Sequence, residues 1–398
     1  MTANTVNARP QYRCIHAIVR WLRGFWGKEE LQVLGINLAL HVTVQLLALQ
    51  FMPLPYYSRL SLHDGNTYYL ISENLWPEQP FTLLSWHKRI LLPVLADVVF
   101  PWNKEMSFLI IGIVAASLSA VFFYKTARRY STNSFQLTLF YSVLPWLLFA
   151  AHHSLSEPLM MLFLLAGYYY FLEDRPWVYT ACFALALLSK ELAALPILAM
   201  GVLIWRRDGW RRAVALAPSV LPFAAFCVLY GLHWGDCAWC LKESPENPLE
   251  NSFSIKTGLW WIYLTLRTGT LSSANPVVAR IYDVGNQLLN MTLLLATAVG
   301  IWRLRRLDTG LLLYNAIVAA PLLLLGRNQY MLNSSLGRQF LITSLAILGF
   351  DSLFSREKAK GAGILQALLV PLAWAGMLLL GTFWTVLYAR FFLYHRLF

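Results

Sequence analysis

The chain has 398 residues, of which 58% are hydrophobic, 15% aromatic and only 13% charged. Soluble domains carry about 25% charged residues, so this composition excludes an ordinary soluble protein. The formal net charge of +12 could indicate binding to nucleic acid. The basic residues are instead concentrated in short breaks between apolar runs, which is typical of a helical membrane protein.

The long apolar runs predict an all-α, polytopic transmembrane protein with about eleven spans. In chain order, we expect these spans at residues 31–52, 106–124, 134–151, 158–172, 177–189, 191–205, 213–232, 281–302, 309–326, 338–354 and 363–388. The pair 177–189 and 191–205 could instead form one long tilted helix. Because basic residues flank both outer ends of this pair, a hairpin with residues 189–191 at its tip fits the sequence better.

The basic breaks all fall on one side of this predicted topology. They are residues 1–30, 125–129, 173–175, 206–212, 303–308 and 356–360. Together they hold more than half of the 32 Lys and Arg residues, whereas most of the 20 Asp and Glu residues fall on the other side. This asymmetry predicts that the breaks are cytoplasmic. The first apolar run lacks a small-residue cleavage site, so we expect it to be a retained span.

This topology divides the chain into a basic N-terminus (1–30), a membrane module (31–232), an outer loop with an interfacial helix (233–280) and C-terminal transmembrane helices (281–398). Another outer loop covers residues 53–105. Its apolar stretch 91–96 is too short to cross a bilayer, so we expect a helix that lies in the interface or re-enters it.

Ionisable side chains gather at the predicted outer ends of the spans. They are His63, Asp64, Arg89, His152, His153, Glu157, Lys190, Glu191 and Arg338. A carboxylate at such a place can take a proton from an acceptor hydroxyl, and cations or a metal can neutralise a departing phosphate. The combination favours group transfer from a lipid phosphate at the membrane surface.

Five short segments, taken in chain order, resemble motifs of the GT-C superfamily, the integral-membrane glycosyltransferases that use polyprenyl-phosphate sugars. The segments are 64–72 (DGNTYYLIS), 89–93 (RILLP), 156–159 (SEPL), 188–191 (LSKE) and 337–340 (GRQF). The first is similar to the DGxxYxxIA segment of GPI-mannosyltransferase-like members, and the second to their RxLxP segment. The resemblance implies a GT-C-like membrane fold in which residues 31–232 are the catalytic module.

The resemblance also implies an activity: inverting transfer of a sugar to a hydroxyl of a glycan, lipid or protein at the outer face of a bacterial inner membrane. It assigns Asp64 as the catalytic base. The implied substrate contacts are His63, Tyr68, Arg89, Glu157, Lys190 and Arg338. Related enzymes carry a pair of acids in the first loop, whereas this chain carries one. A requirement for Mg²⁺ or Mn²⁺ therefore stays open, with Asp64, Glu157 and His153 as candidate ligands.

Each of these residues also has a purely structural interpretation. Asp64 before Gly65 could form a turn, and Glu157 could be a helix-start acid favoured by the macrodipole. Lys190 could pair with its neighbour Glu191 or extend to lipid headgroups. Arg89 and Arg338 could be interfacial anchors, Tyr68 could belong to an aromatic belt, and His63 could be a solvated loop residue.

Other functions remain open on the sequence. A transporter or flippase would favour charges near the bilayer midplane and an internal repeat, and no repeat is visible here. A non-catalytic assembly protein and an O-antigen polymerase or ligase are further alternatives. Cys237 and Cys240 lie in the second long outer loop, where a local disulfide or free thiols are both compatible with the sequence.

Overall fold

The structure is a computed structural model, and it describes most of the first 234 residues and part of the remainder. The described residues are 26–51, 64–76, 89–234, 292, 294–322, 338, 340–351, 372, 375–379 and 381–382. All regular structure among them is helical, which confirms the predicted all-α class.

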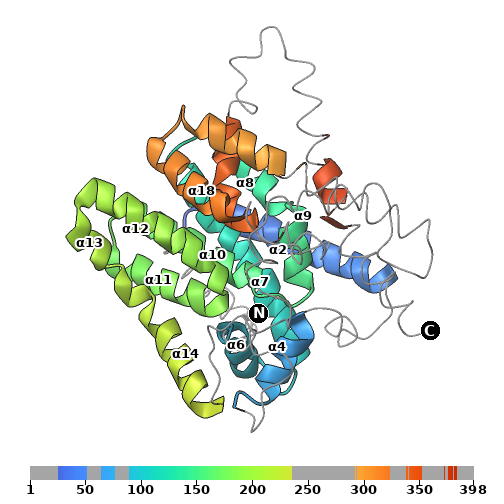
Figure 1. The fold of residues 1–398 in the computed structure, drawn as a ribbon. Coiled ribbons are helices and arrows are strands. Elements are labelled where there is room, and N and C mark those ends of the chain that lie inside the picture. The colour runs from blue at the N-terminus through green and yellow to red at the C-terminus, as the bar shows by residue number, and fades with distance from the viewer. Residues whose placement is uncertain are drawn as a thin grey trace, which may run out of the picture.

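The described helices form a bundle around one long central helix (Figure 1). The bounds are α2 (Lys28–Phe51), α4 (Asp64–Glu73), α6 (Leu91–Val99), α7 (Lys104–Ala127), α8 (Ser134–Ser142), α9 (Pro145–His152), α10 (Glu157–Leu172), α11 (Pro176–Ser189), η1 (Glu191–Ala193), α12 (Ala194–Asp208), α13 (Trp210–Val214), η2 (Ala217–Ser219), α14 (Leu221–Trp234), α18 (Thr309–Leu322) and η3 (Phe340–Phe350). A further helix covers Leu294–Leu304. The central helix is α7, which contacts α2, α6, α8, α9 and α10.

Small residues let α7 pack closely against its neighbours. Gly112, Ala115, Ala116 and Ala120 are all buried on this helix. A Cβ atom on Gly112 would collide with the backbone carbonyl of Ala151 in α9, so the two helices approach each other at backbone distance. Close approach through small residues is the usual packing mode of helices in membranes.

Two described helices, α2 and α7, are long and apolar enough to cross a membrane on their own. Two further spans are obtained only if the bent pairs α8–α9 and α13–α14 each count as one. The predicted count of about eleven spans is therefore not supported by the described residues, and the predicted spans 281–302 and 363–388 lie partly outside them. The physical reason is length, because a helix such as α11, with 14 residues, rises about 21 Å and a bilayer core is about 30 Å thick.

Both bends fall near prolines within runs that the sequence presents as single spans. The α8–α9 pair bends by 52° and the α13–α14 pair by 44°. Pro145 is the first residue of α9 and Pro222 lies in the first turn of α14. Proline has no backbone N–H and its ring disfavours the preceding helical turn, so each proline starts a new helix rather than continuing the old one.

The predicted hairpin at residues 177–205 is confirmed. Helix α11 ends at Ser189, Lys190 is extended, and α12 returns after the single turn of η1. Ion pairs bring the start of α11 close to the end of α12. Asp174, just before α11, lies 3.9 Å from Arg207 in α12 and 3.5 Å from Arg212 in α13. Gly209, with φ of 89°, then allows the sharp turn from α12 into α13.

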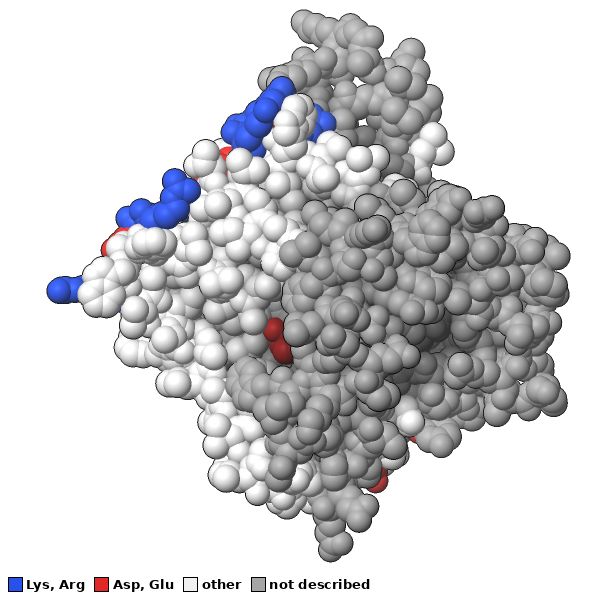
Figure 2. Space-filling view, in the orientation of Figure 1, with Lys and Arg blue, Asp and Glu red and all other residues white. Residues whose placement is uncertain are grey.

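Four of the predicted cytoplasmic breaks meet at one end of the bundle. Arg128 at the end of α7 pairs with Glu29 and Glu30 at the start of α2, at 3.5 and 3.4 Å. Arg129 pairs with Glu173 after α10. With the pairs of Asp174, these contacts join residues 29–30, 128–129, 173–174 and 207–212. Figure 2 shows the Lys and Arg side chains of this basic end along one edge of the molecule.

The predicted interfacial stretch 91–96 is a helix too short to cross a bilayer. It forms α6, which packs on α4 and α7 at the end of the bundle opposite the basic end (Figure 1). Leu92, Pro93 and Ala96 are buried against the bundle, whereas Val98 is 70% exposed. The contacts of α6 hold α4 in place beside the start of α10. The loop 233–280 lies almost entirely outside the described residues, as do Cys237 and Cys240.

Candidate functional site

A buried cluster of ionised side chains lies where α4, α6, α10 and the α11–α12 hairpin tip meet. Its carboxylates are Glu157 and Glu191, and its cations are Arg89, Lys190 and Arg338. Four of the five residues are less than 10% exposed, and the fifth, Glu191, is half-buried. The cluster brings together parts of the chain that are up to 249 positions apart, from Arg89 to Arg338.

Glu157 is placed by the start of α10. Ser154 has a positive φ of 56°, which closes the short turn between α9 and α10. Glu157 and Pro158 then form the first turn of α10, where an acid is favoured by the helix dipole and a proline fits because its missing N–H is not needed. The first turn of α10 therefore presents a carboxylate, only 1% exposed, to the interior of the bundle.

Two cations converge on one oxygen of this carboxylate. Lys190 Nζ donates a hydrogen bond of 2.6 Å to Glu157 Oε1. Arg338 Nη1 lies 3.2 Å from the same oxygen. Lys190 reaches this position because it is extended between α11 and η1, at the tip of the hairpin. The three charged groups are thus desolvated together, and each depends on the others for compensation.

Arg89 forms the second half of the cluster. Its guanidinium makes a bidentate pair with Glu191, with Nε to Oε2 at 2.8 Å and Nη2 to Oε1 at 2.6 Å. Its Nη1 donates to Tyr68 Oη at 3.0 Å. The Tyr68 hydroxyl in turn lies 3.4 Å from Ser156 Oγ. A planar guanidinium suits this fork geometry, and the chain of contacts connects α4 to the start of α10.

An apolar layer beneath the cluster fixes the position of Tyr68. Tyr68 and Ile71 of α4 pack with Leu92 of α6, Phe108 of α7 and Leu159 of α10. All five are nearly or fully buried. The α4 helix is therefore anchored through its apolar face, and this anchoring sets the location of its first residue, Asp64, one turn before Tyr68.

The structure brings five of the predicted site residues into one network: Tyr68, Arg89, Glu157, Lys190 and Arg338. Asp64 is the first residue of α4, but its side chain lies outside the described part of the structure, as does the whole of His63. Lys190 pairs with Glu157, so a pairing with the adjacent Glu191 is not what holds it. The sequence suggested only Lys190 as a partner of Glu191. It did not predict the pair that Glu191 forms with Arg89.

The two adjacent histidines are turned to other partners. His152 Nε2 lies 3.3 Å from His41 Nδ1, and His152 Nδ1 lies 3.0 Å from Gln45 Oε1, both in α2. The ring of His153 packs on Phe149 at 4.3 Å between centroids. Within the described part of the chain, no group of three or more His, Cys, Asp or Glu side chains could hold a metal. The sequence left a metal site with His153 and Glu157 open, and these described side chains do not support one.

Comparison with known proteins does not assign the chain to a family. No model of a known protein family matches the sequence, and no curated protein matches it either. The case for a function therefore depends on the residues and their geometry.

The arrangement of the cations determines what the cluster can bind. Lys190 and Arg338 converge on the single carboxylate of Glu157 in a desolvated place. An arrangement of this kind favours an anion, and a phosphate offers the oxygens that Lys and Arg bind best. The geometry thus shows two buried cations, Lys190 and Arg338, organised by one buried carboxylate, which is a chemistry suited to a phosphate.

Proposed function

We propose that the chain is a membrane glycosyltransferase that moves a sugar from a polyprenyl-phosphate donor to an acceptor hydroxyl. The observation that carries the proposal is the buried pair of cations, Lys190 and Arg338, that converge on the Glu157 carboxylate at the end of the bundle opposite the basic end. By the positive-inside rule, the basic end would face the cytoplasm of a bacterium and the cluster would face outward. The motif resemblance of residues 64–72 and 156–159 supports the same proposal.

In the proposed reaction, the acceptor oxygen forms a bond to the anomeric carbon as the bond from that carbon to the phosphate oxygen breaks. The departing oxygen keeps the electron pair, and Lys190 and Arg338 stabilise the charge that develops on the phosphate. Asp64 takes the proton of the acceptor hydroxyl. Attack from the face opposite the phosphate inverts the configuration of the sugar.

The other residues of the site would hold Lys190, Arg338 and Asp64 in position. Glu157 holds Lys190 and Arg338 in one place. Arg89 and Tyr68 fix α4, and Asp64 lies four residues before Tyr68, about 6 Å along the helix axis. A fixed distance between the base and the phosphate site is what an in-line displacement requires.

The direct test uses purified full-length protein in nanodiscs with a panel of polyprenyl-phosphate hexoses and pentoses and a mixture of hydroxyl acceptors. Mass spectrometry measures the release of free polyprenyl phosphate. We expect turnover of at least one donor and a loss of about 10²–10⁴-fold in Asp64→Asn, the usual contribution of a general base. Asp97→Asn is the matched control, because Asp97 is an acid of the same end that pairs with Lys104.

Asp97→Asn should keep activity within about twofold, since its ion pair is half-exposed and such pairs contribute little. Full activity in Asp64→Asn would remove the base from the mechanism. Absence of donor turnover in the unmodified protein would overturn the transferase proposal itself.

A transporter or flippase of lipid-linked sugars is the second candidate, and the two bent helix pairs favour it. Broken helices are common at transporter binding sites, and α8–α9 and α13–α14 bend by 52° and 44°. An assay in proteoliposomes distinguishes the two functions. A flippase moves labelled donor between leaflets and leaves the sugar–phosphate bond intact, whereas a transferase releases the polyprenyl phosphate.

A further inference from the structure

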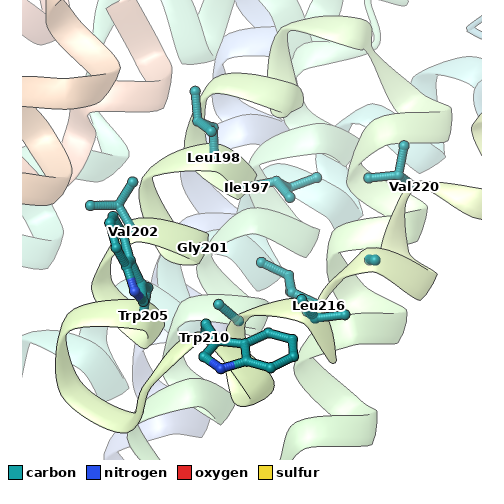
Figure 3. A pocket seen from close by; sticks show the side chains of 11 residues that line it. Ile197, Leu198, Gly201, Val202, Trp205, Trp210, Leu216 and Val220 are labelled. Atoms are coloured by element: carbon teal, nitrogen blue, oxygen red, sulfur yellow. The ribbon is translucent and has the colours of Figure 1, made fainter.

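A surface groove lies along α12, the helix that follows the hairpin tip, and extends to the basic end. The groove, of about 430 Å³, runs between α12 and the α13–η2 segment. The described residues that line it are Gly201 and ten residues with apolar side chains. Figure 3 shows Trp205 and Trp210 near one end of the groove and Leu198 and Val220 near the other.

The groove has a buried floor and an exposed rim. Ile197 and Leu216 form the floor and are 6% and 4% exposed, whereas Leu198 and Trp210 on the rim are 59% and 63% exposed. Gly201 deepens the groove, because a Cβ atom there would meet only Leu216, at 4.0 Å. Exposed apolar side chains around an apolar channel indicate an apolar occupant.

Four arginines stand at the Trp end of the groove, and they fall into two classes. Arg207 lies 2.9 Å from Asp208 and 3.9 Å from Asp174, and Arg212 lies 3.6 and 3.5 Å from the same two acids. The hydrogen bonds from Arg207 lower the pKa of the Asp208 carboxyl, which keeps it ionised in these pairs.

The other two arginines, Arg206 and Arg211, make no ion pair with any described residue. Both are exposed. Arg211 lies over the ring of Trp210, 5.9 Å from its centroid. Arg206 follows Trp205 and Arg211 follows Trp210, so two cations without an ion pair to a described residue adjoin the tryptophans of the groove. Arg206 also lines a neighbouring pocket that contains Asp308.

We propose that this groove binds one anionic glycerophospholipid of the adjacent leaflet. An acyl chain lies in the apolar channel along α12, and the phosphate and anionic headgroup contact Arg206 and Arg211. Trp205 and Trp210 lie at the level of the headgroups, where indole rings are preferred. Basic pockets between helices on the cytoplasmic side are a known way to hold acidic lipids.

The charge pattern decides between occupants. A zwitterionic lipid would not need these two cations, Arg206 and Arg211, and an apolar helix of a second protein would leave them facing a hydrocarbon surface. The proposal depends on insertion of the chain in a membrane but not on glycosyl transfer, so the two can fail separately.

The test is native mass spectrometry of the full-length protein in detergent, with added phosphatidylglycerol or phosphatidylcholine of identical acyl chains. We expect one phosphatidylglycerol to bind about 30-fold more tightly than phosphatidylcholine, as the attraction of two basic residues predicts. Arg206→Gln with Arg211→Gln should abolish this preference, and Gly201→Phe, which fills the channel, should lower retention of both lipids.

Arg305→Gln is the matched control. Arg305 also stacks on a tryptophan, 4.2 Å from the Trp302 ring centroid, and is exposed. It follows the helix Leu294–Leu304, which contributes no residue to the groove, so its substitution should leave retention unchanged. Equal retention of the two lipids by the unmodified protein, or an unchanged preference in the double arginine variant, would overturn the proposal. Loss of a bound second copy of the chain in Gly201→Phe, with lipid retention unaffected, would do the same and assign the groove to a protein contact.

Discussion

Substitution of Lys190 by methionine tests whether the cluster is as desolvated as its geometry indicates. Methionine preserves the length of the side chain and removes the charge, so Glu157 keeps only Arg338, at 3.2 Å. Loss of one partner of a buried ion pair costs about 3–5 kcal/mol. Because Arg338 still compensates the carboxylate, we expect the lower end of this range, about 3 kcal/mol, for Lys190→Met.

Glu157→Gln should destabilise the protein more, because it removes the carboxylate on which the two buried cations, Lys190 and Arg338, converge. We expect about 4–5 kcal/mol. The double variant Glu157→Gln with Lys190→Met removes one charge of each sign and keeps the net charge of the cluster. Its cost should therefore fall short of the sum of the single variants by about 2–3 kcal/mol, the coupling expected for side chains in contact.

The measurement is equilibrium unfolding by SDS in mixed micelles, followed by far-ultraviolet circular dichroism. Arg128→Met serves as the reference, because Arg128 pairs with Glu29 and Glu30 but its side chain is 51% exposed. That variant should lose less than about 1 kcal/mol. If Lys190→Met costs no more than Arg128→Met, or if the coupling energy is near zero, the cluster is solvated and the argument for a buried phosphate site fails.

Two further predictions concern the scaffold of the site. Arg89→Lys keeps the charge but loses the fork that holds Glu191, so we expect about 1–2 kcal/mol of destabilisation and reduced donor turnover in the same nanodisc assay. Gly112→Val should cost about 1–3 kcal/mol by SDS unfolding, because its Cβ collides with the Ala151 carbonyl. Gly35→Ala, with open space around it in α2, should be neutral or slightly stabilising, and equal effects of the two glycine changes would contradict the close packing.

Helix positions were largely predictable because hydropathy and charge breaks mark them directly. The start of α10 at Glu157 follows from a small polar segment, an acid and a proline before an apolar run. The hairpin of α11 and α12 follows from basic residues at both outer ends. The number of membrane-crossing helices was not predictable in this way, since apolar runs do not reveal where a proline such as Pro145 divides a run into two short helices.

The site residues were predictable as a set, but their pairing was not. Charged residues at the outer ends of spans must meet at one surface, which is why Arg89, Glu157 and Lys190 could be grouped from the sequence. Their partners depend on tertiary packing. Glu191 is adjacent to Lys190, yet neighbouring residues point in different directions, so Lys190 reaches Glu157 and Glu191 reaches Arg89.

The contrast between the two ends of the bundle indicates which end has been shaped for function. At the basic end, ion pairs such as Arg128–Glu29 are half-exposed, so they cost little to form and contribute little to stability. At the other end, Glu157 and Lys190 are 1% and 3% exposed, and a well-packed apolar pair of similar volume would serve stability at least as well. Desolvated charge that stability does not require is the physical signature expected of a site that binds a charged ligand.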